Sequence, residues 1–86
     1  MNTMKKNPQA YLTIRAALAV NDPHAIIIIK TAPRKWVAVD TGGGFVCRTN
    51  TKRDAARYGI GAQAELIRTL CKHVRAYCGR TGKRLA

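Results

Sequence analysis

The chain has 86 residues, which is the size of one small domain and leaves no room for a second domain or a dinucleotide-binding fold. Its content of 47% apolar and 23% charged residues is typical of a folded globular protein and excludes disorder throughout the chain. Sixteen Lys and Arg face only four acids, for a formal net charge of +12, and this balance indicates a partner that carries negative charge.

The acidic residues form no recognisable catalytic pair. General acid–base and two-metal chemistry needs carboxylates held close together, whereas Asp22, Asp40, Asp54 and Glu65 are spread along the chain. We therefore expect a protein that is not an enzyme and that uses no cofactor. The longest apolar run, residues 25–29, is far shorter than the about 20 residues of a membrane span, and no signal-peptide pattern is present, so we expect a cytoplasmic protein.

The first predicted element is a helix over residues 8–20, after a flexible N-terminus of residues 1–7. Asn7 can cap the first turn, and Pro8 suits the first helical position, where no backbone N–H is needed. Apolar side chains then recur at helical spacing, at Tyr11, Ile14 and Leu18.

Three strands are predicted next, joined as an antiparallel meander. Residues 26–29 are four isoleucines in a row, which a helix disfavours because β-branched side chains lose rotamer freedom there. Residues 35–40 alternate in polarity after a turn at Pro33, and residues 45–49 form the third strand. Residues 42–44 are three glycines that suit a hairpin turn, and they lack the Lys-Ser/Thr ending of a phosphate-binding loop.

The last predicted element is a helix that begins near Thr51 and ends at Gly79. Thr51, with Asp54 three positions later, approximates a capping box. Gly59 and Gly61 each disfavour a helix, so a kink or a short break is expected near Ile60. The apolar face that should pack on the sheet includes Leu66, Ile67, Leu70 and Val74.

The expected fold is therefore α+β: a single small domain over residues 8–79, in the order α-β-β-β-α, with a three-stranded antiparallel sheet. Residues 80–86 are predicted to be a basic C-terminal tail.

The basic residues are grouped along this predicted fold. They lie in the first hairpin turn, in the first turns of the last helix, at i, i+4 and i+7 on the polar face of that helix, and in the tail. A solvated helix face normally mixes acids with bases, but Glu65 is the one acid after Asp54. We expect these residues to bind nucleic-acid phosphates: Arg34, Lys35, Lys52, Arg53, Arg57, Arg68, Lys72, Arg75, Arg80, Lys83 and Arg84.

Lys52 and Arg53 stand at a helix start, where positive charge opposes the helix dipole. The placement becomes favourable when a bound anion interacts with both the dipole and the side chains. The sequence therefore predicts a phosphate site near residues 51–57.

The order helix, three-stranded sheet, helix with a basic start is similar to the double-stranded-RNA-binding domain. In that family a Lys-Lys-x-Ala-Lys pattern opens the second helix after a small polar residue, and residues 51–57, Thr-Lys-Arg-Asp-Ala-Ala-Arg, resemble it. Ala56 stands at the second basic position of the pattern. Residues 32–39 occupy the place of the family's Gly-Pro-x-His loop without its glycine or histidine. The likeness covers residues 8–74 in topology and implies contact with the RNA backbone.

A rival resemblance rests on residues 25–58 alone. Three strands followed by a helix resemble the three-stranded DNA-binding modules of phage-type integrase arm domains and plant ethylene-response factors. Those modules read the major groove with Arg and Trp on a sheet face, and Arg34, Trp36 and Arg48 are residues of the matching kind. The very apolar first strand argues against an exposed reading face.

The cysteines and histidines favour no metal or nucleophile site. Cys71 and His73 on one helix would point about 200° apart, and neither Cys47 nor Cys78 completes a Cys-x2 to x4-Cys pair. We expect buried thiols and no bound metal.

Two partner classes are left open. Alternate isoleucines of the first strand would face water if both helices lay on one side of the sheet, so a homodimer or protein partner could cover an apolar face that includes Ile26, Ile28 and Trp36. One helix on each face is the other possibility. The main expectation is a non-catalytic nucleic-acid-binding protein, and the alternative is a small basic phage-type inhibitor that docks on a host nucleic-acid-handling enzyme or defence complex.

Overall fold

The computed structural model describes residues 8–86, so the N-terminal segment expected to be flexible, residues 1–7, lies outside the described residues. The elements in chain order are α1 (Pro8–Asn21), β1 (Ile26–Ala32), β2 (Lys35–Asp40), β3 (Phe45–Thr49), α2 (Lys52–Leu66), a short 3₁₀ helix η2 (Cys71–His73) and β4 (Ala76–Cys78). The predicted first helix and the three predicted strands are confirmed.

The sheet has four strands in the order β3-β2-β1-β4. The β1–β2 and β2–β3 pairs are antiparallel, and β4 pairs in parallel with β1. The α+β class is confirmed, but the expected three-stranded antiparallel sheet is wrong, because the chain adds a fourth strand and makes the sheet mixed.

The fourth strand replaces the second half of the predicted last helix. The helix ends at Leu66, and Arg68 follows with a φ of 57°. Ala76–Cys78 then lies against Ile26–Ile28, the buried first half of β1, where backbone groups would otherwise lack partners. The expected helix through to Gly79 is therefore wrong.

Helix α2 packs against one face of the sheet and is continuous. Its buried alanines contact Ile26 and Ile28, whose side chains are 0% and 1% exposed. A Cβ at Gly59 would lie 2.6 Å from the Cδ1 atom of Ile26 and 2.9 Å from the Cβ atom of Ala38. The glycine lets the helix approach the sheet, and α2 continues through Ile60, so the short break considered there is wrong.

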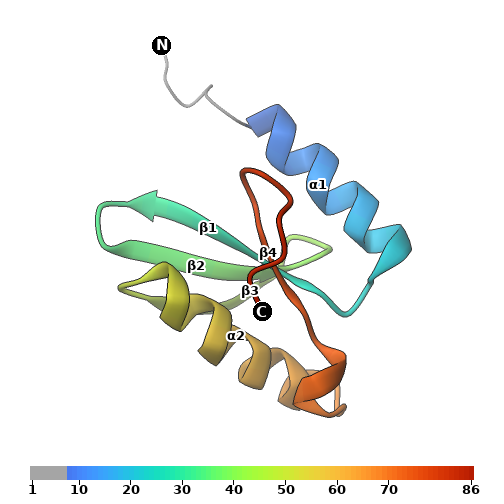
Figure 1. Ribbon diagram of the computed structural model, residues 1–86. Helices are drawn as coiled ribbons and strands as arrows, with labels where there is room; N and C mark the ends of the chain where they lie inside the picture. The colour runs from blue at the N-terminus through green and yellow to red at the C-terminus, as the bar shows by residue number, and fades with distance from the viewer. Residues whose placement is uncertain (1–7) are drawn as a thin grey trace.

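Helix α1 lies on the other side of the sheet from α2 (Figure 1). The side chain of Ile27, which points away from α2, is 0% exposed. Ile26 and Ile28 are buried beneath α2 and are not available to a partner, so the expected apolar docking face of Ile26, Ile28 and Trp36 is wrong. Trp36 alone of the three stays half-buried.

The segment expected to be a tail folds back along β4. The Cys78 N–H donates to the carbonyl of Lys83 (2.9 Å), and the Leu85 N–H donates to the carbonyl of Ala76 (2.7 Å). The Leu85 side chain packs against the core below α2. Residues 80–86 are thus part of the folded structure.

The core prediction for the last element is mostly wrong. Val74 is buried, at 3% exposed, but Leu66, Ile67 and Leu70 are 66%, 37% and 58% exposed because the helix on which they were to share a face ends at Leu66. No helix within residues 8–86 is long and apolar enough to cross a membrane.

Candidate functional site

Strand directions bring the basic segments to one end of the sheet. Because β1, β3 and β4 run the same way and β2 runs opposite, three connections leave the sheet toward the same end: the β1–β2 turn, the β3–α2 connection and residues 79–83 after β4. Figure 1 shows the β1–β2 turn and the start of α2 near each other at the left of the view. We call this the basic end, and it comprises Lys30, Arg34, Lys35, Lys52, Arg53, Arg57, Arg80 and Lys83.

Helix α2 starts at this end because of a local cap. The Oγ1 atom of Thr51 accepts a hydrogen bond from the N–H of Asp54 at 3.1 Å, as the capping pattern predicts. Lys52 and Arg53 therefore stand in the first turn, next to backbone N–H groups that have no partner within the helix. This geometry suits an anion that contacts both kinds of donor.

Trp36 lies beside the helix start. It is the cross-strand partner of Lys30, and the Nζ atoms of Lys30 and Lys52 each lie 5.8 Å from the centre of its ring. The ring also packs against the core, which fixes its position. Two ammonium groups thus share one half-buried aromatic ring.

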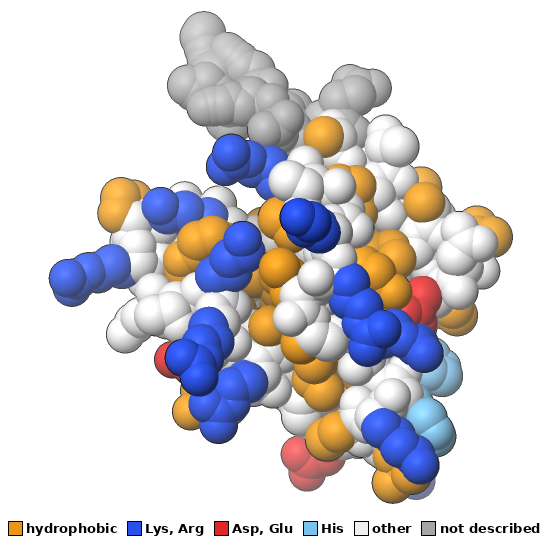
Figure 2. Space-filling view, viewed as in Figure 1, with side chains coloured by type: hydrophobic (Ala, Val, Ile, Leu, Met, Phe, Trp, Pro, Cys, Tyr) orange, Lys and Arg blue, Asp and Glu red, His pale blue; other side chains and the backbone are white. Residues whose placement is uncertain are grey.

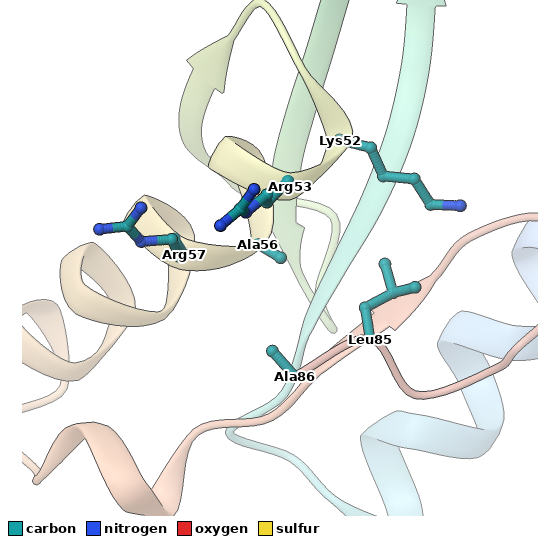
Figure 3. Close-up of a pocket in the computed structure, with 6 residues that line it drawn as sticks. All are labelled: Lys52, Arg53, Ala56, Arg57, Leu85 and Ala86. Carbon is teal, nitrogen blue, oxygen red and sulfur yellow. The ribbon is translucent and has the colours of Figure 1, made fainter.

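A hollow of about 400 Å³ opens between the first turns of α2 and the C-terminal segment (Figure 3). Its lining residues are Lys52, Arg53, Ala56, Arg57, Leu85 and Ala86. The backbone oxygen of Ala86 already accepts from the N–H of Ala76 (3.0 Å) and from Nε of Arg84 (3.2 Å). Lys52, Arg53 and Arg57 supply cationic groups to the hollow, and Ala56 and Leu85 supply a small apolar surface.

Asp54 lies in the first turn of α2, within the basic end, whereas Glu65 lies in the last turn of that helix. Asp22 pairs with Arg75 at 3.5 Å and accepts from the hydroxyl of Tyr77 at 3.0 Å, while Asp40 accepts from the N–H groups of its own turn. Within the part of the chain that the structure describes, Arg75–Asp22 is the one ion pair. Figure 2 shows Lys and Arg side chains spread over the face seen there, with few acidic side chains among them.

Several predicted site residues are not brought to the basic end. Arg68 follows the end of α2 and Lys72 lies in η2, so the expected i, i+4, i+7 row with Arg75 does not exist. Arg75 is engaged by Asp22, and Arg84 lies opposite Tyr77 on the returning C-terminal segment. The predicted set is therefore not brought together at one place.

Sequence reasoning missed Lys30 and the part that Trp36 plays. Lys30 was not singled out because it follows the isoleucine run without another basic residue beside it. The signal was available in principle: once the turn at residues 33–34 is placed, antiparallel pairing brings Lys30 opposite Trp36.

The expectation of buried thiols holds for Cys78 only, because Cys47 is half-buried and Cys71 is exposed. Burial raises the pKa of the Cys47 thiol. Burial also acts to raise the pKa of Cys78, but hydrogen bonds from Thr81 and Arg80 and the charge of Lys52 outweigh it and lower that pKa. No cluster of three or more His, Cys, Asp or Glu that could hold a metal ion occurs among residues 8–86.

No family model, curated protein or solved structure significantly matches this chain. The resemblance to the double-stranded-RNA-binding domain thus stays a prediction, and the function must be argued from the site.

Proposed function

We propose that the protein binds nucleic acid through its phosphate backbone and catalyses no reaction. The observation that carries this proposal is the basic end itself, where connections from three parts of the chain place Lys and Arg residues at the same end of the sheet. Within residues 8–86 none of these side chains forms an ion pair with a carboxylate. An anionic partner offsets the mutual repulsion of such a group, and nucleic-acid phosphates supply regularly spaced negative charge.

The burial of the apolar strands supports the same partner. Ile26, Ile27 and Ile28 are 0–1% exposed, so the isoleucines of β1 present no apolar face that a protein partner would need to cover. What faces solvent at the basic end is positive charge around a half-buried aromatic ring.

The first test is a titration with single- and double-stranded DNA and RNA at two salt concentrations. If about six phosphates are neutralised, affinity should fall on the order of a thousandfold between about 50 and 200 mM salt, because each contact releases condensed counterions. Affinity that stays flat across this range would remove the proposal.

The second test reverses charge at the start of α2. Lys52→Glu with Arg53→Glu should leave the fold as stable or slightly more stable, because acids suit a helix N-terminus, and should weaken binding on every sequence alike. The matched control is Arg68→Glu with Lys72→Glu, which makes the same charge change away from the basic end and should cost much less affinity. Equal losses in the two variants would mean that only net charge matters.

A specific surface supports the inhibitor alternative. Leu66, Ile67 and Leu70 expose apolar side chains within five positions of one another, and Arg68 and Lys72 lie among them. An apolar patch edged by cations is typical of a surface that docks on an acidic protein. This candidate gains support if the titrations show no nucleic-acid binding, and it locates the docking surface away from the basic end.

A further inference from the structure

We infer that the basic end takes single-stranded nucleic acid, with a base stacked on Trp36 and phosphates held by the neighbouring Lys and Arg side chains. The inference rests on the proposed function and adds to it the class of nucleic acid and the residue that selects it. Three features support it: the setting of Trp36, the two lysines over its ring, and the adjacent hollow.

The setting of Trp36 suits a stacking platform. The ring packs against the core of buried Ile26, Ile28 and Ala38, so it is held in place, yet the residue is only half-buried. An aromatic ring that is fixed before binding loses little conformational freedom when a base stacks on it. Single-strand-binding proteins use aromatic rings in basic grooves in this way.

The two lysines mark the part of the ring that a base would reach. Lys30 and Lys52 each place Nζ 5.8 Å from the ring centre, and neither has a carboxylate partner among the described residues. A solvent-exposed cation–π contact is weaker than the stacking of a base on an aromatic ring. A base can therefore displace the ammonium groups from the ring, and the freed lysines can contact the phosphates on either side of that base.

The hollow continues the site from Lys52. Figure 3 shows Arg53 and Arg57 on α2 at one side of the hollow and Lys52 extending away from them. Lys52 thus belongs both to the hollow and to the Trp36 ring. A strand with its base on Trp36 can place a neighbouring phosphate against Arg53 and Arg57.

A duplex fits this arrangement less well. Bases in a duplex are paired and stacked inside the helix, so a ring beside α2 cannot reach their faces, and only phosphates are offered to the protein. A single strand presents unstacked bases and phosphates together. The half-buried Trp36 therefore favours the single strand.

Trp36 is the single tryptophan of the chain, so its fluorescence reports on the site directly. The probes are a single strand of about 12 nucleotides, a duplex of the same sequence, and the same strand with abasic sites throughout. The intact strand should quench Trp36 emission and should bind roughly tenfold more tightly than the abasic strand or the duplex, neither of which should quench it.

Two variants test the residues. Trp36→Phe keeps an aromatic ring in the core and should weaken single-strand binding several-fold while duplex binding stays unchanged, because phosphate contacts do not use the ring. Lys30→Gln with Lys52→Gln should weaken binding more than the matched control Arg68→Gln with Lys72→Gln, which removes the same charge elsewhere. If Trp36→Phe does not fold, the quenching experiment on the unaltered protein decides.

The outcomes separate this inference from the proposed function. No binding to any nucleic acid overturns both. Salt-dependent binding with equal or higher affinity for the duplex, or single-strand binding that leaves Trp36 emission unchanged, overturns the inference and keeps the proposed function. Equal binding of the intact and abasic strands also overturns it.

Discussion

Two glycines stand two positions apart on α2, and only one of them faces the sheet. A Cβ at Gly59 would meet the Cδ1 atom of Ile26 at 2.6 Å and the Cβ atom of Ala38 at 2.9 Å, whereas a Cβ at Gly61 would meet nothing within 4 Å. Ala38 has no rotamer that could make room. Gly59 therefore serves close packing, while Gly61 only weakens the helix.

Substitutions at these glycines should change stability in opposite directions. Gly61→Ala should raise the free energy of unfolding by about 0.5 to 1 kcal/mol, because alanine favours the helix. Gly59→Ala should lower the free energy of unfolding by about 1 to 3 kcal/mol through overpacking. The higher helix propensity of alanine offsets a part of that loss. Urea unfolding of both variants checks this, and a stabilised Gly59→Ala would mean that α2 can move away from the sheet.

Hydrogen bonding joins Asp22, the residue after α1, to Tyr77 in β4. The Tyr77 hydroxyl donates to Asp22 at 3.0 Å, and Asp22 also pairs with Arg75 at 3.5 Å. Burial, the hydrogen bond and the charge of Asp22 raise the pKa of Tyr77 above 10.0, although the charges of Arg75 and Arg84 oppose them.

The raised pKa of Tyr77 fixes the sign of a pH effect on stability. The unfolded chain releases the tyrosine proton first, so the stabilisation is fully present below the unfolded pKa and is lost as pH rises through the folded one. Urea unfolding at about pH 8 and pH 11 should therefore show a larger loss for the unaltered protein than for Tyr77→Phe. Equal losses would show that other groups account for the whole effect.

At the scale of elements, residues 67–78 show how a local pattern can mislead. Leu66, Leu70 and Val74 have helical spacing, but Val74, Ala76 and Cys78 also alternate with more exposed residues, as in a strand. The chain adopts the second pattern because β1 needs a partner on its open edge. No glycine between residues 62 and 78 marks where α2 ends, so the sequence held no ordinary stop signal.

Truncation of two residues tests this assignment. Val74→Ala should cost about 2 kcal/mol, because the side chain is 3% exposed and its removal leaves a cavity. Leu70→Ala should cost less than about 0.5 kcal/mol, because Leu70 is 58% exposed. Thermal or urea unfolding compares the stability of the two variants. A larger loss of stability for Leu70→Ala would support the long helix that was expected from the sequence.

At the scale of the whole molecule, charge acts on folding and binding in opposite ways. The chain has a net charge of +12, and residues 8–86 contain a single ion pair, Arg75–Asp22. Like charges concentrated at one end repel one another in the folded state, where they are held close. This repulsion destabilises the folded state, whereas the same charges attract an anionic partner.

Salt should therefore stabilise the free protein while it weakens the proposed complex. Raising sodium chloride from about 10 to 150 mM shortens the screening length from about 30 to 8 Å, so the melting temperature should rise. Lys35→Gln with Lys83→Gln lowers the charge of the basic end and should show a smaller rise. A melting temperature that falls with salt would mean that attraction between charges dominates in the folded state.

Local chemistry by itself determined α1, the three strands β1 to β3 and the start of α2. Four consecutive isoleucines, the glycine turn and the Thr51 cap each act within a few residues, so their effect can be predicted without the rest of the chain. The excess of positive charge, and with it the expectation of an anionic partner, is likewise a property of the sequence.

Only the tertiary structure decided where that charge gathers. The parallel pairing of β4 with β1 joins segments about 50 positions apart, and no local pattern fixes such a pair. That pairing directs residues 79–83 toward the same end of the sheet as the β1–β2 turn and the start of α2, whereas Arg68 and Lys72 precede β4 and lie toward the opposite end. The basic end exists because strand direction, a long-range property, places distant cations together.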